Sequence, residues 1–152
     1  MDMHEYMMGI LSNYHEIQIY AEKVIEQVFQ PVGLTRLQGL ILLLVYSGNT
    51  NSIGDVAKCL GIKQGNCSVV CKKLESVGYL TRERNASDER VVKLALTDKG
   101  KQAIEDVKAE SARKGCVLED IEPSKLNRIA EGVLAVKEVL KLMYDTTIAS
   151  EE

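Results

Sequence analysis

The sequence predicts a mainly α-helical protein with a small β-hairpin, an α+β fold dominated by helices. The long helices are predicted by apolar residues that recur at steps of three and four over residues 5–29 and 126–143. The hairpin is predicted by two short strand-like segments, 79–84 and 91–96, that flank the polar and turn-compatible residues 85–90. The 152 residues suffice for one domain with extensions.

Composition indicates a protein of the cytoplasm. Apolar residues make up 45% of the chain and charged residues 27%, which are ordinary values for a globular protein. The longest apolar run, Leu40 to Tyr46, is far shorter than the ~20 residues of a membrane span. The acidic N-terminus lacks the basic and apolar regions of a signal peptide. We therefore expect a cytoplasmic location and no membrane contact.

Basic residues are concentrated in the middle of the chain. The whole chain carries a net charge of −3. Residues 52–100, however, hold nine Lys or Arg against six Asp or Glu, whereas the remainder holds ten against sixteen. A locally basic segment within an acidic chain is the arrangement that a polyanion-binding surface needs.

The N-terminal helix, residues 5–29, carries a heptad seam on one face, and such seams usually pack against another helix. Pro31 and Gly33 are expected to end this helix. The seam residues are Met7, Ile10, Tyr14, Ile17, Ala21, Val24 and Val28.

Two further helices follow the N-terminal one. Thr35 and Gln38 form a capping-box pattern at the start of the first one, LQGLILLLVYS, which is apolar nearly all round and is therefore predicted to be buried. After a break at residues 48–51, Ser52 is the expected N-cap of a short helix. Gly61 is expected to end that helix in the left-handed conformation.

A second short helix, expected over residues 63–77, has two distinct faces and ends at Gly78. One face is apolar and predicted to be buried. It consists of Cys67, Val70, Cys71, Leu74 and Val77. The other face is polar and basic, apart from one valine. It consists of Lys63, Gln64, Asn66, Ser68, Val69, Lys72 and Lys73.

Two long helices complete the chain after the hairpin. Thr97 can cap a helix over residues 98–114, and Pro123 suits the first position of the last helix. The last helix carries a second heptad seam, formed by Leu126, Ile129, Val133, Val136, Leu140 and Met143. The order of elements is therefore a helix–turn–helix with an appended hairpin, flanked by long amphipathic helices.

These segments together resemble the MarR family of bacterial and archaeal transcriptional regulators. The resemblance runs from about residue 34 to residue 101. It is carried by the ordered landmarks Leu74-Glu75-x-x-Gly78-x-Leu80-x-Arg82, Asp88-x-Arg90 and Leu96-Thr97-x-x-Gly100. The resemblance implies a winged helix-turn-helix domain over residues 34–114 and a helical dimerisation region formed by residues 1–33 and 115–152.

The resemblance also implies a function in transcription. It implies a homodimer that binds double-stranded DNA at a pseudo-palindromic operator, as a repressor, with helix 63–77 in the major groove. It further implies that Arg90 at the hairpin tip enters the minor groove, that Asp88 orients it, and that a small aromatic or phenolic effector releases the DNA. The expected DNA contacts are Lys63, Gln64, Asn66, Ser68, Val69, Lys72, Lys73, Arg82, Arg84, Asp88 and Arg90.

One of these expected contacts differs from the family pattern, and three charged residues of the hairpin have a second interpretation. Family members often carry an arginine where this chain has Val69, and a valine offers no hydrogen bond, although it can contact a thymine methyl group. Arg82, Arg84 and Lys93 are individually expected to be solvated charges of the hairpin, some of which touch phosphates.

The cysteines leave an alternative open. Without a secretion signal, reduced thiols are expected at all four, the last being Cys116. Cys59, Cys67 and Cys71 could serve a thiol- or metal-responsive regulator, or Cys67 and Cys71 could pack as small hydrophobic residues. Because no spacing matches a zinc module, neither a metal nor a cofactor is expected.

The same residues leave a second alternative open and argue against an enzyme. A winged-helix module that binds proteins and not DNA is one alternative. An enzyme is not expected, because no Ser/His/Asp arrangement, phosphate-cradling loop or paired-carboxylate site is visible in the sequence.

Overall fold

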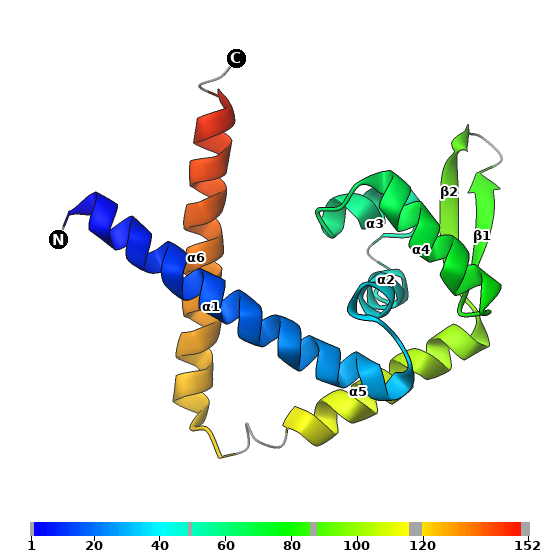
Figure 1. Cartoon of the computed structure of the whole chain (residues 1–152), viewed down its shortest axis with the longest axis horizontal. Helices are drawn as coiled ribbons and strands as arrows, with labels where there is room; N and C mark the ends of the chain where they lie inside the picture. The colour runs from blue at the N-terminus through cyan, green and yellow to red at the C-terminus, as the bar shows by residue number, and fades with distance from the viewer. Residues whose placement is uncertain (1, 49, 86–87, 116–119, 150–152) are drawn as a thin grey trace. The chain divides into compact units, whose positions relative to one another are not determined.

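The computed structural model describes residues 2–48, 50–85, 88–115 and 120–149, and these residues confirm the mainly helical fold with a small hairpin (Figure 1). In chain order the elements are α1 (Met3–Phe29), the 3₁₀-helix η1 (Gln30–Val32), α2 (Arg36–Tyr46), α3 (Ile53–Cys59), α4 (Gln64–Ser76), β1 (Leu80–Asn85), β2 (Asp88–Leu96), α5 (Asp98–Gly115) and α6 (Pro123–Ala149). The chain divides into two compact units, Met1–Arg113 and Lys114–Glu152.

The helix ends follow local rules that the sequence displays. At α2 the backbone N–H of Gln38 donates to Thr35 Oγ1 at 3.4 Å, and the N–H of Thr35 donates to Gln38 Oε1 at 2.9 Å, which confirms the capping box. At α3 the N–H of Asp55 donates to Ser52 Oγ at 3.1 Å. Gly61 ends the helical region after α3 with a φ of 64°, as expected.

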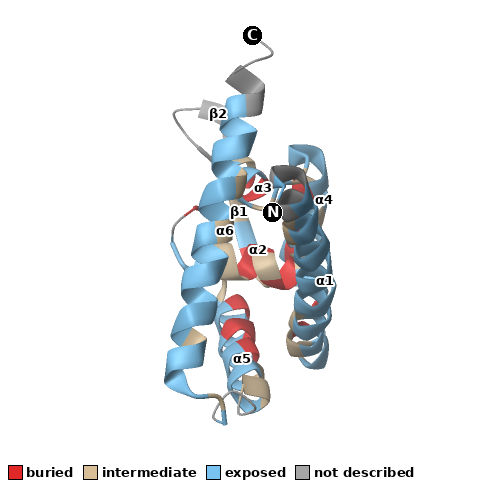
Figure 2. Cartoon of the chain, turned by 90° about the vertical axis from the view of Figure 1, so that its left-hand side faces the viewer, coloured by how far each residue is buried: buried red, intermediate tan, exposed pale blue. Residues whose placement is uncertain are grey.

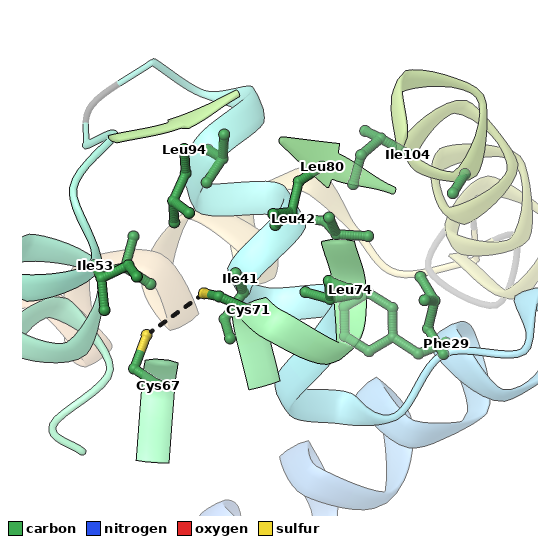
Figure 3. Packing of buried hydrophobic residues seen from close by; sticks show 14 of the residues in the cluster. Phe29, Ile41, Leu42, Ile53, Cys67, Cys71, Leu74, Leu80, Leu94 and Ile104 are labelled. Atoms are coloured by element: carbon green, nitrogen blue, oxygen red, sulfur yellow. Dashed lines mark hydrogen bonds between the residues drawn. The ribbon is translucent and has the colours of Figure 1, made fainter. Parts of the chain in front are cut away.

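The first unit is built around α2. Ile41 and Leu42 are fully buried, and the neighbouring elements turn their apolar side chains toward them (Figure 3). These side chains include Phe29 from the end of α1, Leu74 from α4, Leu80 from β1, Leu94 from β2 and Ile104 from α5. The prediction that α2 is central and buried is therefore confirmed.

The hairpin pairs β1 with β2 in antiparallel register, from Leu80 opposite Leu96 to Arg84 opposite Val92. The register then shifts, and Asn85 pairs with Asp88. The predicted turn over residues 85–90 is therefore too long, because residues 88–90 belong to β2. The physical reason is that strand pairing uses backbone groups, so polar side chains do not stop it, and a bulge takes up the extra residues.

The two long helices leave most of their surface exposed (Figure 2). In the first unit, the C-terminal part of α1 joins the core through Ile25, Val28 and Phe29. In the second unit, α6 begins at Pro123 as predicted. The seams of both helices have exposed members, Tyr14, Ile17 and Val24 on α1 and Ile129, Val133 and Met143 on α6. The side chain of Met7 lies outside the described residues.

No single one of the described helices is long and apolar enough to cross a membrane. One pair, Met8–Val32 with Arg36–Tyr46, reaches the required length and composition only when taken together, and the two parts are bent by 83°.

A methyl group at Gly39 should destabilise the first unit. A Cβ at this position would overlap the buried ring of Phe29, so Gly39→Ala should lower the free energy of unfolding by about 1–3 kcal/mol. Gly65 of α4 is the matched control, because nothing lies within 4 Å of a Cβ there. Gly65→Ala should leave stability unchanged or raise it by up to ~1 kcal/mol.

Chemical denaturation of both variants at one protein concentration provides the measurement. Equal stabilities for Gly39→Ala and the wild-type chain would contradict the packing of Phe29 against α2.

Candidate nucleic-acid interface

The inner face of α4 is committed to the core. Cys67, Cys71 and Leu74 are fully buried, and Val70 is half-buried against the same cluster. The predicted inner face is thus confirmed except at Val77, which is exposed and follows the last residue of the helix. Burial of this face fixes the rotation of α4 about its own axis, so the opposite face must point to solvent.

The outer face of α4 is polar and basic with one apolar side chain at its centre. Lys63, Gln64, Asn66, Lys72 and Lys73 are exposed, as predicted, whereas Ser68 is half-buried. Val69 is 67% exposed, which is high for a valine in the middle of a helix. The face therefore offers ammonium groups for phosphates, amides for base edges and one pair of methyl groups.

The N-terminus of α4 lacks a side-chain cap. Lys63 is the N-cap residue, and its side chain makes no capping hydrogen bond. Gly65, in the first turn, has open space where a Cβ would stand. Backbone N–H groups of a first turn attract anions, so this end of α4 can accept a close phosphate.

Arg82 is not the solvated charge that the sequence suggested. Its side chain is only 17% exposed, and Nη1 lies 3.4 Å from Glu75 Oε2 of α4. Arg82 pairs in register with Leu94 and shares the strand face of Leu80, so its stem lies on the core side of the hairpin. Period-two alternation from Leu80 would have placed Arg82 on this face, whereas its ion pair with Glu75 is a contact between elements that alternation does not reveal.

The remaining hairpin residues are described only in part. The side chains of Arg84, Asp88 and Arg90, and of Cys116 elsewhere in the chain, lie outside the described residues. Lys93 is exposed and stands opposite Glu83 in the ladder. A contact of Arg90 with DNA therefore stays a prediction from the sequence.

The thiols of α4 pack as small hydrophobic groups. Cys67 Sγ and Cys71 Sγ lie 4.0 Å apart and are fully buried, whereas Cys59 is exposed. Burial raises the pKa of the Cys67 thiol, and it raises the pKa of Cys71 to about 12, where the charge of Cys67 adds to the effect. Both thiols are therefore protonated near neutral pH and are poor nucleophiles and metal ligands.

A metal site is not supported by the described part of the chain. Within residues 2–48, 50–85, 88–115 and 120–149, no group of three or more His, Cys, Asp or Glu side chains is placed to hold a metal ion.

The elements of this interface match a known protein family. A profile described as "Transcriptional regulator SarA/Rot" matches residues 23–107, which are more than half of the chain and run from the end of α1 into the first part of α5. The chain belongs to this family of MarR-like winged-helix transcriptional regulators.

Two curated relatives of this SarA/Rot-type regulator show how far the similarity extends. The HTH-type transcriptional regulator BilQ of Clostridioides difficile (strain CD3) is 30% identical over 108 residues, which are 69% of each chain. The uncharacterized HTH-type transcriptional regulator YdgJ of Bacillus subtilis (strain 168) is 33% identical over 92 residues, 60% of this chain but only 56% of YdgJ. These relatives are regulators and not enzymes, in agreement with the sequence-based prediction.

A solved structure extends the similarity to the three-dimensional fold. The transcriptional repressor CouR, bound to a 23-mer DNA duplex, matches this regulator with a TM-score of 0.71 and 26% identity. The match covers 86% of this chain and 96% of the CouR chain. The winged helix-turn-helix fold expected from the sequence is thereby confirmed.

Burial should make the thiols react unequally. Brief treatment of the native protein with iodoacetamide, followed by peptide mass spectrometry, should modify Cys59 and leave Cys67 and Cys71 intact, because the latter two are buried and protonated. The same treatment in denaturant should modify all four cysteines of the sequence, Cys116 included, and serves as the control. Rapid modification of Cys67 or Cys71 in the native protein would revive the thiol-responsive alternative.

Proposed function

We propose that this regulator is a homodimer that binds double-stranded DNA at a pseudo-palindromic operator and represses transcription there. The observation that carries the proposal is the division of α4 into two faces. Its apolar face packs in the core. Its outer face presents Lys72, Lys73 and the amides of Gln64 and Asn66 to solvent. An exposed basic helix of this kind fits the width of the DNA major groove.

In this proposal the residues on the outer face of α4 make two kinds of contact, one with phosphates and one with base edges. Lys63, Lys72 and Lys73 contact phosphates, which set affinity and register without reading sequence. Gln64 and Asn66 can bind adenine edges through paired hydrogen bonds, and Val69 can pack on a thymine methyl group. An operator rich in A·T pairs under α4 is therefore favoured.

The hairpin supplies the second contact of the proposal. Its tip carries Arg90 and Asp88, and an arginine suits a narrow, electronegative minor groove. The carboxylate two residues away can restrain the guanidinium by a paired hydrogen bond. The similarity to CouR, whose structure contains a 23-mer duplex, supports DNA as the partner.

A homodimer is favoured by the apolar side chains that α1 and α6 each leave in solvent. On α1 these include Leu11, Ile17 and Tyr20, and on α6 they include Val133, Leu134 and Leu142. Soluble chains rarely leave so many large apolar side chains on a helix without a partner. A two-fold symmetric dimer would present two copies of α4 to half-sites about 34 Å apart.

The control of this regulator is proposed from the family resemblance alone. A small aromatic or phenolic effector would favour a spacing of the two α4 helices that does not fit DNA, and the operator would be released by population shift. The proposed site of action is the cytoplasm, where a bacterial or archaeal chromosome lies.

Charge removal on α4 and at the hairpin tip should weaken DNA binding in different ways. Lys72→Ala should lower affinity for all duplexes alike and reduce the slope of log affinity against log salt by about 1, because one phosphate contact is lost.

Arg90→Ala should weaken operator binding by about 1–3 kcal/mol, because the proposed contact of this arginine with the minor groove is lost. The measurement is fluorescence anisotropy with a duplex selected by the wild-type protein from a random library.

Lys101 is the matched control, because it is an exposed lysine of α5 outside both contact surfaces. Lys101→Ala should leave the salt slope unchanged. Failure of the wild-type protein to enrich any duplex would overturn DNA binding and favour the protein-interaction alternative.

A charge placed among the exposed apolar side chains of α1 and α6 should separate the proposed dimer. Wild-type protein should have about twice the 16.9 kDa mass of one chain in light scattering. Tyr20→Glu and Leu142→Glu, at positions 65% and 68% exposed in the single chain, should shift the mass toward 16.9 kDa because a carboxylate would be buried in the interface.

Val69→Glu is the control for this experiment, since it places the same charge on an equally exposed apolar position of α4. It should leave the dimer intact. A wild-type protein that remains a single chain at micromolar concentration would contradict the proposed homodimer.

A further inference from the structure

The C-terminal end of α4 meets the start of α5 in a compact set of contacts. The set joins Thr97, Lys99 and Gly100 to the main chain of Val77, Gly78 and Tyr79, and we call it the clasp. It links residues about twenty positions apart in sequence, on either side of the hairpin. It includes Thr97 and Gly100 of the Leu-Thr-x-x-Gly landmark, whose role neither the buried core nor the DNA-facing surface accounts for.

The end of α4 closes in a way that leaves two carbonyl groups for the clasp. Gly78, with a φ of 80°, donates its N–H to Glu75 O at 2.9 Å, and Tyr79 N–H donates to Leu74 O at 2.9 Å. These two bonds form a Schellman motif, which satisfies carbonyls of the last turn. The carbonyls of Val77 and Gly78 point beyond it and accept from other donors.

Thr97 and Lys99 supply these donors. Thr97 Oγ1 donates to Gly78 O at 2.6 Å and accepts from the N–H of Gly100 at 3.1 Å, so one hydroxyl caps α5 and holds the end of α4. Lys99 Nζ donates to Val77 O at 2.7 Å and lies 4.7 Å from the ring centre of Tyr79. Its positive charge also lies at the negative end of the α4 dipole.

Gly100 allows the two segments to approach this closely. A Cβ on Gly100 would collide with the carbonyl oxygen of Tyr79, so no larger residue fits without moving β1 or α5. Thr97 N–H also donates to Tyr79 O, at 3.2 Å. The side of α5 that follows is anchored in the core by Ala103, Ile104 and Val107, so α5 provides a fixed support for the end of α4.

We propose that Thr97 and Lys99 are positioning residues that set the placement of α4 for reading base sequence. The proposal rests on the proposed DNA-binding function. Hydrogen bonds to base edges require donor and acceptor to meet within a few tenths of an ångström, whereas long lysine side chains reach phosphates from a range of helix positions. A loosened clasp should therefore reduce sequence discrimination more than it reduces general affinity for DNA.

The test compares affinity for the selected operator with affinity for a scrambled duplex of the same composition, at one salt concentration. Thr97→Val and Lys99→Met remove the donors and keep the side-chain size, and Thr97→Ser and Lys99→Arg restore a donor. Lys101→Met is the charge control. We expect Thr97→Val and Lys99→Met to lower the ratio of the two affinities by about tenfold, the loss of one base contact, and the restoring variants to recover it.

A purely structural role would give a different result. Partial unfolding removes protein from binding to both duplexes equally, so the ratio would stay at the wild-type value while both affinities fell. That result, or unchanged affinities, would overturn the proposal. Thr97 carries no charge, so a ratio that falls in Lys99→Met but not in Thr97→Val would also overturn it.

Three further outcomes are separable. If Thr97→Val does not fold, Lys99→Met carries the test, because the side chain of Lys99 lies at the surface. If the wild-type protein binds no duplex, the proposed function fails and the positioning role fails with it. If the wild-type protein discriminates the operator and the variants discriminate it equally well, the positioning role alone fails.

Discussion

The burial of α2 is the constraint on which the rest of the first unit depends. A helix that is apolar nearly all round must be surrounded, and Ile41 and Leu42 are fully enclosed. Each surrounding element therefore turns its apolar side inward and its polar side outward. For α4 this inward side consists of Cys67, Cys71 and Leu74, so the core determines which side chains the helix can present to a partner.

The attachments of α4 are unevenly distributed along its length. Its C-terminal part is tied to the hairpin by the Glu75–Arg82 ion pair and to α5 by the clasp, whereas its N-cap residue Lys63 makes no capping bond. Local stability in proteins follows the density of such contacts. The last turn of α4 is thus the part that polar contacts with the hairpin and α5 hold in place.

Local rules account for most of what the sequence predicted correctly. The capping box of Thr35 and the left-handed Gly61 depend on residues a few positions apart, so their patterns are visible in one dimension. The hairpin bounds were wrong because backbone pairing continues through charged residues. Arg82 was misplaced because charge was weighed above strand alternation, and the contact of Lys99 with Val77 joins distant segments that no short pattern connects.

The hairpin has a further property that follows from its neighbours. Beyond its pairing with β1, β2 makes a bridge between Lys93 and Ser52, and Leu94 N–H donates to Asn51 O at 2.6 Å. Both edges of β2 are therefore occupied at this level by segments of the same chain. An exposed strand edge invites another molecule to add a strand, which is a common route to aggregation. The connection before α3 thus covers the edge of β2 that faces away from β1 at Lys93 and Leu94, and another strand cannot add there.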